Sequence, residues 1–236
     1  MSQEAAEPLG RGAGPVDPRA RLSYEGIGLE MDEEASAPLP VLHRWYVEAM
    51  ADERVAEPGA MVVATVGTDG LPNARTVLLK ALDERGFVFF TNVESAKGRE
   101  LADNPVASLV LLWHPMYRQV RARGPVERVS VQDAEEYFTS RPRDSQVAAW
   151  ASVQSQPLSS SQALTDALAA VEERFAGQET LPLPDFWGGY RIRPIEVELW
   201  VGQRSRLHDR WSWATSDGQP ALLDDGTRWV VGRLQP

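Results

Sequence analysis

Residues 60–92, AMVVATVGTDGLPNARTVLLKALDERGFVFFTN, decide the fold. They hold three runs rich in β-branched and aromatic residues, at residues 60–68, 73–80 and 87–92, with turn signals at Thr68-Asp69-Gly70 and residues 83–86. Strands joined by turns this short pair antiparallel, because a parallel pair needs a crossover of a dozen or more residues. The stretch therefore predicts an antiparallel meander and argues against a βαβ unit.

Further strands and helices are expected around this meander. Apolar or alternating runs predict strands at 107–113, 119–129, 190–201, 207–214 and 228–234, with Gly124-Pro125 as a bulge or edge. Helical spacing and capping residues predict helices from about Pro40, at 95–104, from Ser130, at 144–152 and from Ser161. The predicted fold class is mainly β with peripheral helices: an antiparallel barrel or closed sheet.

The chain is expected to form one folded domain behind an arm. Residues 1–37 are rich in Ala, Gly, Pro and Glu without a period, which predicts a flexible N-terminal arm, disordered or ordered on binding. Residues 38–236 form the domain, and the helices at about 130–180 read as an insertion between strands. No internal repeat is present.

Composition excludes several function classes. The 236 residues carry a formal net charge of −10, which argues against nucleic acid as the main partner because phosphate backbones require a basic face. No apolar run approaches the length of a membrane span, and the N-terminus lacks the pattern of a secretory signal. A cytoplasmic protein is expected.

Redox chemistry, if present, requires an organic cofactor. The chain has no cysteine and three histidines, none in a paired metal-ligand spacing, so no metal site is expected. Only two of the 24 basic residues are lysines, Lys80 and Lys97, a weak indication that an ammonium group is needed there. No glycine-rich phosphate loop or nucleophile elbow occurs, so an anion would be bound by side chains and short helices.

Four basic clusters are candidate anion sites. They are Arg75 with Lys80; Thr91, Asn92, Ser95 and Lys97; Tyr137, Ser140, Arg141, Arg143, Ser145 and Gln146; and Arg206, His208 and Arg210 beside Trp200. Arginine forks match phosphate oxygens bidentately, and a helix N-terminus such as that after Ser95 suits phosphate. Alternation places Arg206, His208 and Arg210 on one face of a predicted strand. Each cluster, taken alone, is also compatible with a solvated surface or an ordinary helix cap.

Seven segments in one order resemble a known family. RTVLLK, FFTN-x-x-SAK, YRQV, YFTSRPRDSQ, S-x-QS, WGGYR and RLHDR together resemble the pyridoxamine 5′-phosphate oxidase family, over about residues 21–236. The resemblance implies an FMN-binding split β-barrel, a homodimer with FMN at the subunit interface, and oxidation of pyridoxamine or pyridoxine 5′-phosphate to pyridoxal 5′-phosphate. O₂ would accept the electrons and hydrogen peroxide would form.

The resemblance also implies roles for individual residues. The residues matched to FMN binding are Arg75, Thr76, Val77, Leu78, Leu79, Lys80, Phe90, Thr91, Lys97, Gln119, Gln154, Ser155, Trp200 and Arg210. Those matched to the substrate are Arg21, Tyr24, Lys80, Tyr137, Arg141, Ser145, Arg206, Leu207 and His208, with Arg206 and His208 as the catalytic pair. Two departures are Ala96, where many members carry arginine, and Phe90, where tyrosine is common.

Besides a plain β-barrel interaction module, which predicts a colourless protein, two other readings remain open. One is a split-barrel flavin or deazaflavin oxidoreductase acting on another substrate, for example a phenazine-pathway oxidase, which the phosphate-type set Tyr137, Arg141 and Ser145 disfavours. The other is a flavin- or pyridoxal-phosphate-binding protein without turnover, which the presence of Arg206 and His208 disfavours.

Overall fold

The structure is a computed structural model that describes Tyr24, Gly26 and residues 36–236. The predicted arm therefore falls almost entirely outside the described residues, and so does the predicted substrate residue Arg21.

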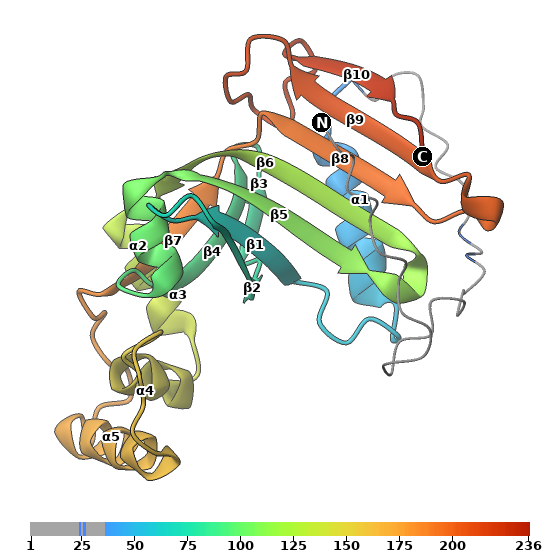
Figure 1. The fold of residues 1–236 in the computed structure, drawn as a ribbon. Coiled ribbons are helices and arrows are strands. Elements are labelled where there is room, and N and C mark those ends of the chain that lie inside the picture. Colours follow the sequence, from blue (N-terminus) through green and yellow to red (C-terminus); the bar gives the residue numbers. More distant parts are fainter. Residues whose placement is uncertain (1–23, 25, 27–35) are drawn as a thin grey trace, which may run out of the picture.

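Antiparallel strands dominate the chain, as predicted (Figure 1). The strands are β1 Ala60–Val66, β2 Pro72–Leu78, β3 Ala81–Asp83, β4 Gly86–Asn92, β5 Val106–Trp113, β6 Arg118–Arg128, β7 Trp187–Ile192, β8 Glu196–Val201, β9 Asp209–Thr215 and β10 Trp229–Arg233. The helices are α1 Leu39–Ala51, α2 Ala96–Asp103, α3 Val131–Ser140, α4 Arg143–Ala151 and α5 Ser161–Arg174, with 3₁₀ turns at His114–Met116 and Arg204–Arg206.

One long strand joins two parts of the sheet. The main path runs β10-β9-β8-β6-β5-β1-β2, while β3, β4 and β7 form a second part that meets β6 through β7. Strand β6 pairs with β8 over Arg118 to Arg123 and with β7 over Val126 to Arg128, so Gly124-Pro125 marks the change of partner. The bulge or edge predicted at Gly124-Pro125 is therefore wrong, because β6 stays paired with β5 through these residues and only its other neighbour changes. The result is the mainly antiparallel half-barrel of a split-barrel fold.

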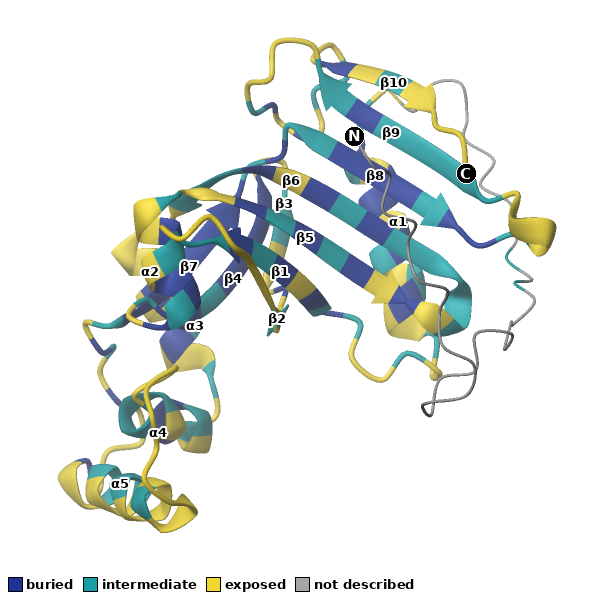
Figure 2. Ribbon diagram, in the orientation of Figure 1, coloured by how far each residue is buried: buried dark blue, intermediate teal, exposed yellow. Residues whose placement is uncertain are grey.

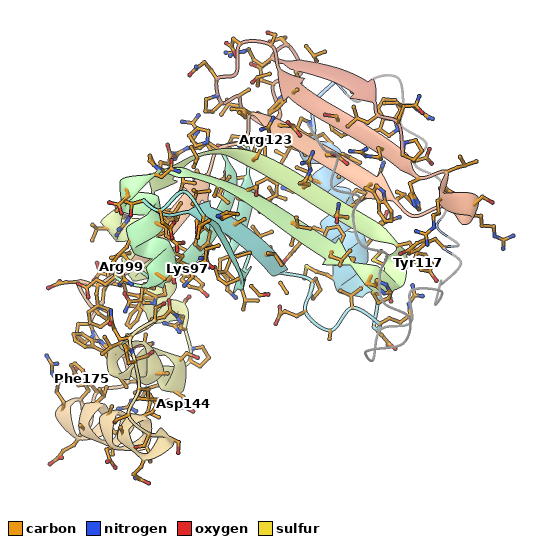
Figure 3. All side chains as sticks on the ribbon, viewed as in Figure 1. Lys97, Arg99, Tyr117, Arg123, Asp144 and Phe175 are labelled. Carbon is orange, nitrogen blue, oxygen red and sulfur yellow. The ribbon has the colours of Figure 1, made fainter. Side chains whose placement is uncertain are left out.

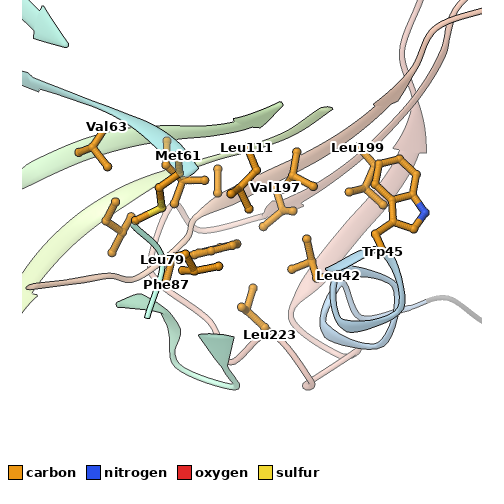
Figure 4. Packing of buried hydrophobic residues seen from close by; sticks show 14 of the residues in the cluster. Leu42, Trp45, Met61, Val63, Leu79, Phe87, Leu111, Val197, Leu199 and Leu223 are labelled. Atoms are coloured by element: carbon orange, nitrogen blue, oxygen red, sulfur yellow. The ribbon is translucent and has the colours of Figure 1, made fainter. Parts of the chain in front are cut away.

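Alternation along the strands builds the core. Inward residues such as Met61, Leu111 and Leu199 are fully or almost fully buried, and α1 covers them with Leu42 and Trp45 (Figure 4). The opposite face of the same strands carries exposed apolar side chains, Val62, Leu78 and Leu112 among them. The outward residues lie in register from β2 to β5, because Val62 is paired with Thr76 and Val110. Figure 2 shows how the buried residues gather on the sheet while α5 is largely exposed.

Several predicted strand boundaries are wrong. The single strand expected at 190–201 is two strands, β7 and β8, because Pro194 interrupts the run. The strand expected at 73–80 ends at Leu78, and the unpredicted strand β3 follows. The strand expected at 207–214 begins only at Asp209, so Arg206 and His208 lie before it rather than alternating with Arg210 along one face.

The polar segment 217–227, between the predicted strands 207–214 and 228–234, is partly a core element. Leu223 is fully buried in the main core, and its backbone N–H donates to the Glu84 carbonyl at 2.6 Å. The Leu223 carbonyl in turn accepts from the Leu39 N–H at 2.9 Å, at the start of α1. The loop therefore connects α1 to the β3–β4 turn.

The described residues form five α-helices where the sequence predicts them, and α4 and α5 pack mainly on each other rather than on the sheet. Met50 in α1 and Leu164 in α5 are apolar residues of these helices, yet they are 65% and 38% exposed. In the described part of the chain, no helix is long and apolar enough to cross a membrane.

Candidate functional site

A cavity of about 460 Å³ lies where β2 and β4 meet α3, α4 and the segment that follows α4. Ten of the predicted site residues line it: Thr76, Val77, Leu78, Lys80, Phe90, Thr91, Lys97, Tyr137, Arg141 and Gln154. Asn92, Ala148, Ala149, Ser152 and Trp187 complete the lining. Residues as far apart as Thr76 and Trp187 thus meet in one concavity of the size typical for a cofactor or small ligand.

Lys97 is a buried cation in the wall of this cavity. It lies in the first turn of α2, whose N-cap Ser95 accepts from the Gly98 N–H. Its ammonium donates to Gln154 Oε1 at 2.7 Å, Thr91 Oγ1 at 3.1 Å and Ser95 Oγ at 3.3 Å. Burial is the main reason that the pKa of Lys97 is lowered to about 8, and the charge of the neighbouring Arg75 is the second. All three acceptors are neutral, so the group is suited to an anion.

Arg75 lies beside the cavity rather than in its lining. Its guanidinium forms an ion pair with Glu100 at 2.9 Å and donates to Thr65 Oγ1 at 2.5 Å. Glu100 also accepts from the Thr65 hydroxyl and from Asn73 Nδ2. Burial opposes ionisation of Glu100, but these hydrogen bonds hold its pKa below the usual value. Arg75 is therefore already neutralised by a carboxylate.

Aromatic rings hold the second cation of the cavity, Arg141. Its guanidinium lies over the rings of Trp187 and Phe138, with Cζ 5.1 Å and 5.5 Å from their centroids. Burial lowers the pKa of Arg141, and its Nη1 is buried with no hydrogen-bond partner among the described residues. A buried donor without a partner is costly, and a ligand oxygen would satisfy it.

The other arginine of the Arg-Pro-Arg segment has a structural role. Arg143 donates to Glu172 at 2.5 Å and to the carbonyl of Gln178 at 2.9 Å, which ties α4 to α5. Ser145, matched to the substrate phosphate, lies in the first turn of α4 and is not in the cavity lining. Leu79 packs into the core instead, and Ser155 is exposed and outside the lining.

A second group of predicted residues gathers elsewhere on the chain. Trp200 on β8 is in register with Gln119 on β6 and with Arg210 on β9, so the three form one row across the sheet. His208 lies 4.6 Å from Trp200 and 5.7 Å from Tyr24 between ring centroids. None of these five residues lines the cavity. Figure 3 labels Lys97 near α2 and Tyr117, which packs against Tyr24, at the opposite end of β5 and β6.

Arg206 and His208 are held by the turn before β9. Ser205 and Arg206 have φ values of 56° and 62°, a left-handed conformation that is uncommon outside glycine and clusters at functional sites. His208 Nδ1 accepts from the Gln203 N–H at 3.1 Å, so the neutral ring carries its proton on Nε2. Burial and then Arg206 lower the pKa of His208, which favours that neutral form. Leu207 is exposed.

Three residues that contact the arginines of the site were not predicted from the sequence. Trp187 occurs in the quoted WGGYR segment, but nothing in the sequence pairs it with Arg141. Glu100 and Glu198 are acidic residues in strands or helices of ordinary composition, yet they bind Arg75 and Arg210. Only the three-dimensional pairing identifies them.

Comparisons with known proteins point to one family. Residues 47–175 match the family model described as pyridoxamine 5′-phosphate oxidase, and residues 187–236 match that of the pyridoxine 5′-phosphate oxidase C-terminal dimerisation region. The chain is 45% identical to the pyridoxine/pyridoxamine 5′-phosphate oxidase of Salinibacter ruber over 92% of this chain and 97% of that protein. It is 46% identical to the Bordetella pertussis protein of the same name, with the same two coverages.

Solved structures agree in fold. PhzG from Burkholderia lata, solved in complex with tetrahydrophenazine-1-carboxylic acid, matches with a TM-score of 0.78 and 30% identity over 91% of this chain and all of that one. A pyridoxamine 5′-phosphate oxidase-related, FMN-binding protein from Nostoc punctiforme matches with a TM-score of 0.65 and 17% identity over 85% of this chain and 98% of that one. The second likeness concerns the fold alone.

Proposed function

Because this chain belongs to the pyridoxamine 5′-phosphate oxidase family, we propose that it is an FMN-dependent oxidase of pyridoxamine 5′-phosphate and pyridoxine 5′-phosphate. The product is pyridoxal 5′-phosphate, with O₂ as acceptor and hydrogen peroxide as the reduced product. One observation carries the proposal: a single cavity contains the buried Lys97 and the half-buried Arg141, whose Nη1 is buried, and neither cation is paired with a carboxylate among the described residues. Two such cations suit two phosphorylated ligands.

The residues present fit FMN. Lys97, the Thr91 hydroxyl and the N-terminal turn of α2 provide a cation, a hydroxyl and free N–H groups for its phosphate. The strand residues Thr76 to Leu78 provide a wall for its ring system. When bound, FMN supplies the chemistry of the reaction: it takes a hydride from the substrate and gives two electrons to O₂, which leaves as hydrogen peroxide.

The chain's own residues bind and orient the substrate. Arg141, Lys80 and Tyr137 hold its phosphate, with Ser145 at the start of α4 nearby. Arg206 and His208 cover the pyridine ring, and the proton on His208 Nε2 is available to a ring substituent. Fixed orientation of two ring systems of this kind is worth up to ~7–11 kcal/mol of the barrier.

The site is proposed to be shared by two copies of the chain in a homodimer. The cavity with Lys97 and Arg141 is one half, and the row of Gln119, Trp200 and Arg210 with Arg206 and His208 is the other. The exposed apolar outward face of the sheet and the match to a C-terminal dimerisation region support this arrangement.

The visible spectrum of the purified protein tests the function. We expect a yellow protein whose flavin absorbance bleaches on anaerobic addition of pyridoxamine 5′-phosphate and returns with peroxide release when air is admitted. A flavin reduced instead by a phosphate-free tricyclic acid of the kind bound to PhzG would favour the alternative substrate class. A flavin that no substrate reduces would favour a non-catalytic binding protein.

Replacement of Arg206 is expected to affect turnover but not FMN binding. Arg206→Ala is predicted to lower turnover per bound flavin by roughly 100-fold or more while FMN occupancy stays near that of the wild type, because Arg206 acts on the reacting ring rather than on the cofactor phosphate. Steady-state peroxide assays and the flavin-to-protein absorbance ratio measure the two quantities. A collapse of occupancy with normal turnover per flavin would show that this role is wrong.

A further inference from the structure

Arg141 differs from the other candidate site arginines in how it is held. Arg75 and Arg210 each donate to a carboxylate, Glu100 at 2.9 Å and Glu198 at 2.9 Å, so their charge is compensated inside the chain. Arg141 forms no ion pair within the described residues, and aromatic faces of Trp187 and Phe138 lie against its guanidinium instead. A ring face attracts a cation without neutralising it, whereas a carboxylate competes with any incoming anion.

Trp187 is itself fixed in place. It is the first residue of β7, is paired with Asn92 of β4, and is 7% exposed. Its ring is parallel to that of Phe90, with 5.4 Å between centroids and 5° between planes, and Phe138 meets it edge-on at 5.1 Å. The ring therefore has neighbours on more than one side, and it presents a rigid surface to the guanidinium.

The backbone of Arg141 is fixed independently. Gln146 is 2% exposed, and its Nε2 donates to the Arg141 carbonyl at 2.8 Å while its Oε1 accepts from the Leu181 N–H at 2.7 Å. Because this clamp sets the main chain, the rotamers of the Arg141 side chain are the remaining freedom. The rings of Trp187 and Phe138 limit that freedom.

We propose that Trp187 is a positioning residue that holds the Arg141 guanidinium at the cavity wall with its charge uncompensated, and that this contact sets the preference for a phosphorylated substrate over its unphosphorylated form. The identity of the two substrates rests on the proposed function. Trp187 contacts the arginine, and the arginine contacts the phosphate.

Substrate selectivity tests the proposal, with kcat and KM measured for pyridoxamine 5′-phosphate and for pyridoxamine in the FMN-loaded protein. Trp187→Met, which removes the ring face, is expected to lower the ratio of the two kcat/KM values about tenfold, mainly through KM of the phosphorylated substrate. Trp187→Phe keeps a ring face and is expected to keep most of the ratio. A general loss of structure would lower both substrates together, so an unchanged ratio in Trp187→Met overturns the proposal.

The chain offers a matched control in the same helical layer. The Arg174 guanidinium lies 4.8 Å from the ring centroid of Trp150, and neither residue lines the cavity. Trp150→Met is therefore expected to lower the melting temperature while leaving the ratio unchanged. An equal loss of selectivity in Trp150→Met and Trp187→Met would assign the effect to packing and would overturn the proposal.

Arg141→Lys tests the same contact without changing the core, should Trp187→Met fail to fold. Lysine keeps the charge but lacks the flat guanidinium that stacks on Trp187, so the ratio is expected to fall about tenfold. A wild-type ratio in Arg141→Lys would show that charge alone suffices and would overturn the proposal.

Failure of the proposed function gives a different result. If the wild-type protein oxidises neither pyridoxamine 5′-phosphate nor pyridoxamine, the proposed function is wrong. The inference about Trp187 can then still be tested on the same FMN-loaded protein, by measuring how much inorganic phosphate raises its melting temperature. Trp187→Met is then expected to need about tenfold more phosphate for the same rise. An unchanged phosphate dependence overturns the inference.

Discussion

Lys97 combines burial with a full set of neutral hydrogen-bond acceptors. Thr91, Ser95 and Gln154 orient the ammonium but contribute no negative charge, so burial can lower its pKa to about 8. A bound phosphate would favour the ammonium and raise that pKa. Binding of a phosphorylated cofactor must therefore be coupled to proton uptake above pH 8.

This coupling predicts a pH dependence of FMN affinity. Below about pH 8 Lys97 is already protonated and the affinity is flat, since a phosphate monoester is a dianion above its second pKa of about 6. Above pH 8 the affinity is expected to fall by up to tenfold per pH unit. Quenching of flavin fluorescence by the apoprotein, titrated between pH 7 and about 9.5, measures it.

Two variants make this test specific. Lys97→Met is expected to bind FMN more weakly and without the break near pH 8. Arg99→Met, which changes an exposed cation on the same helix, is expected to keep the wild-type profile. A break near pH 8 that survives in Lys97→Met would contradict the assignment.

Glu198 is a buried carboxylate between two arginines. Its side chain is 4% exposed, and it accepts from Arg210 Nε at 2.9 Å and from Arg121 Nη2 at 2.7 Å. Burial opposes its ionisation, but hydrogen bonds from Arg210 and Arg121 outweigh that effect and lower the pKa of Glu198. The folded state therefore gains stability from this ion above the usual glutamate pKa and loses it as the pH falls toward the lowered value.

Glu198→Gln is expected to lower the free energy of unfolding by about 3 kcal/mol at pH 7, because it leaves Arg210 without its carboxylate partner and Arg121 with Glu196 alone. Urea unfolding measures this, and the difference from the wild type should shrink as the pH falls below about 4.5. Glu196→Gln, at a carboxylate 19% exposed, is the control and should cost about 1 kcal/mol or less. Equal costs would contradict the role of burial.

Most residues of the cavity lining could be predicted from the sequence, but the side chains that contact them could not. It selected Lys97 and Arg141 because their neighbours suit phosphate, and the structure brings both to one cavity. It could not separate Arg141 from Arg143, since Glu172, which neutralises Arg143, comes from a helix 29 positions along the chain. Carboxylate partners of this kind depend on tertiary packing and leave no local pattern.

Strand β6 changes partner where the chain has no room for a side chain. A Cβ on Gly124 would lie 2.0 Å from the Arg193 carbonyl oxygen, while Pro125 next to it accepts from the Arg193 N–H at 2.8 Å. The crossing of β6 over the β7–β8 connection thus requires close backbone contact. Glycine and proline predicted a bulge or an edge here, and the structure instead shows a change of strand partner that needs this close contact.

Gly124→Ala is expected to lower the free energy of unfolding by about 2–3 kcal/mol, because the opposing atoms are backbone and cannot move independently. Chemical denaturation measures the change. Gly232→Ala in β10 is the control, since a Cβ there meets no atom of the described chain within 4 Å. If both variants unfold at the same denaturant concentration as the wild type, the close contact is not limiting.

Whether a segment is a helix or a strand was easier to predict than its first and last residues. Helical spacing and capping residues predicted α1, α3, α4 and α5; the first three contain buried residues, and α5 contributes only the partly buried Leu168 and Val171. The run 190–201 alternates apart from Pro194, and this proline lies between the end of β7 and the start of β8, so the sequence did contain the signal that divides them. The predicted position of Arg206 on a strand face is wrong, because a left-handed turn at Ser205 and Arg206 precedes β9.

The complete molecule is proposed to function as a pair of identical chains. Within one chain, the cavity and the row with Trp200 and Arg210 do not meet, so each needs its counterpart from another copy. A C2 dimer supplies both counterparts at once, because the same surface is used twice. Each active site then contains residues of both chains.

Subunit mixing tests this arrangement. Lys97→Met impairs the cavity half and Arg206→Ala the other half, so exchange between the two inactive dimers should restore one intact site in each mixed dimer. Since about half of the dimers are mixed, activity should recover to roughly a quarter of the wild type. Lys97→Met mixed with Arg141→Met impairs the same half twice and should recover nothing. Absence of recovery in the first mixture, with exchange confirmed by mass spectrometry, would place the site within one chain.

The link between α1 and Leu223 has a consequence for how the protein is made. Leu39 donates to the Leu223 carbonyl, and Leu42 and Trp45 share a core with Val197, Leu199 and Leu223 (Figure 4). A ribosome that adds ~5–20 residues per second exposes α1 many seconds before those partners emerge. The part of the α1 apolar face that packs on Val197, Leu199 and Leu223 must therefore stay uncovered until those residues emerge, although Trp113 can cover Trp45 earlier.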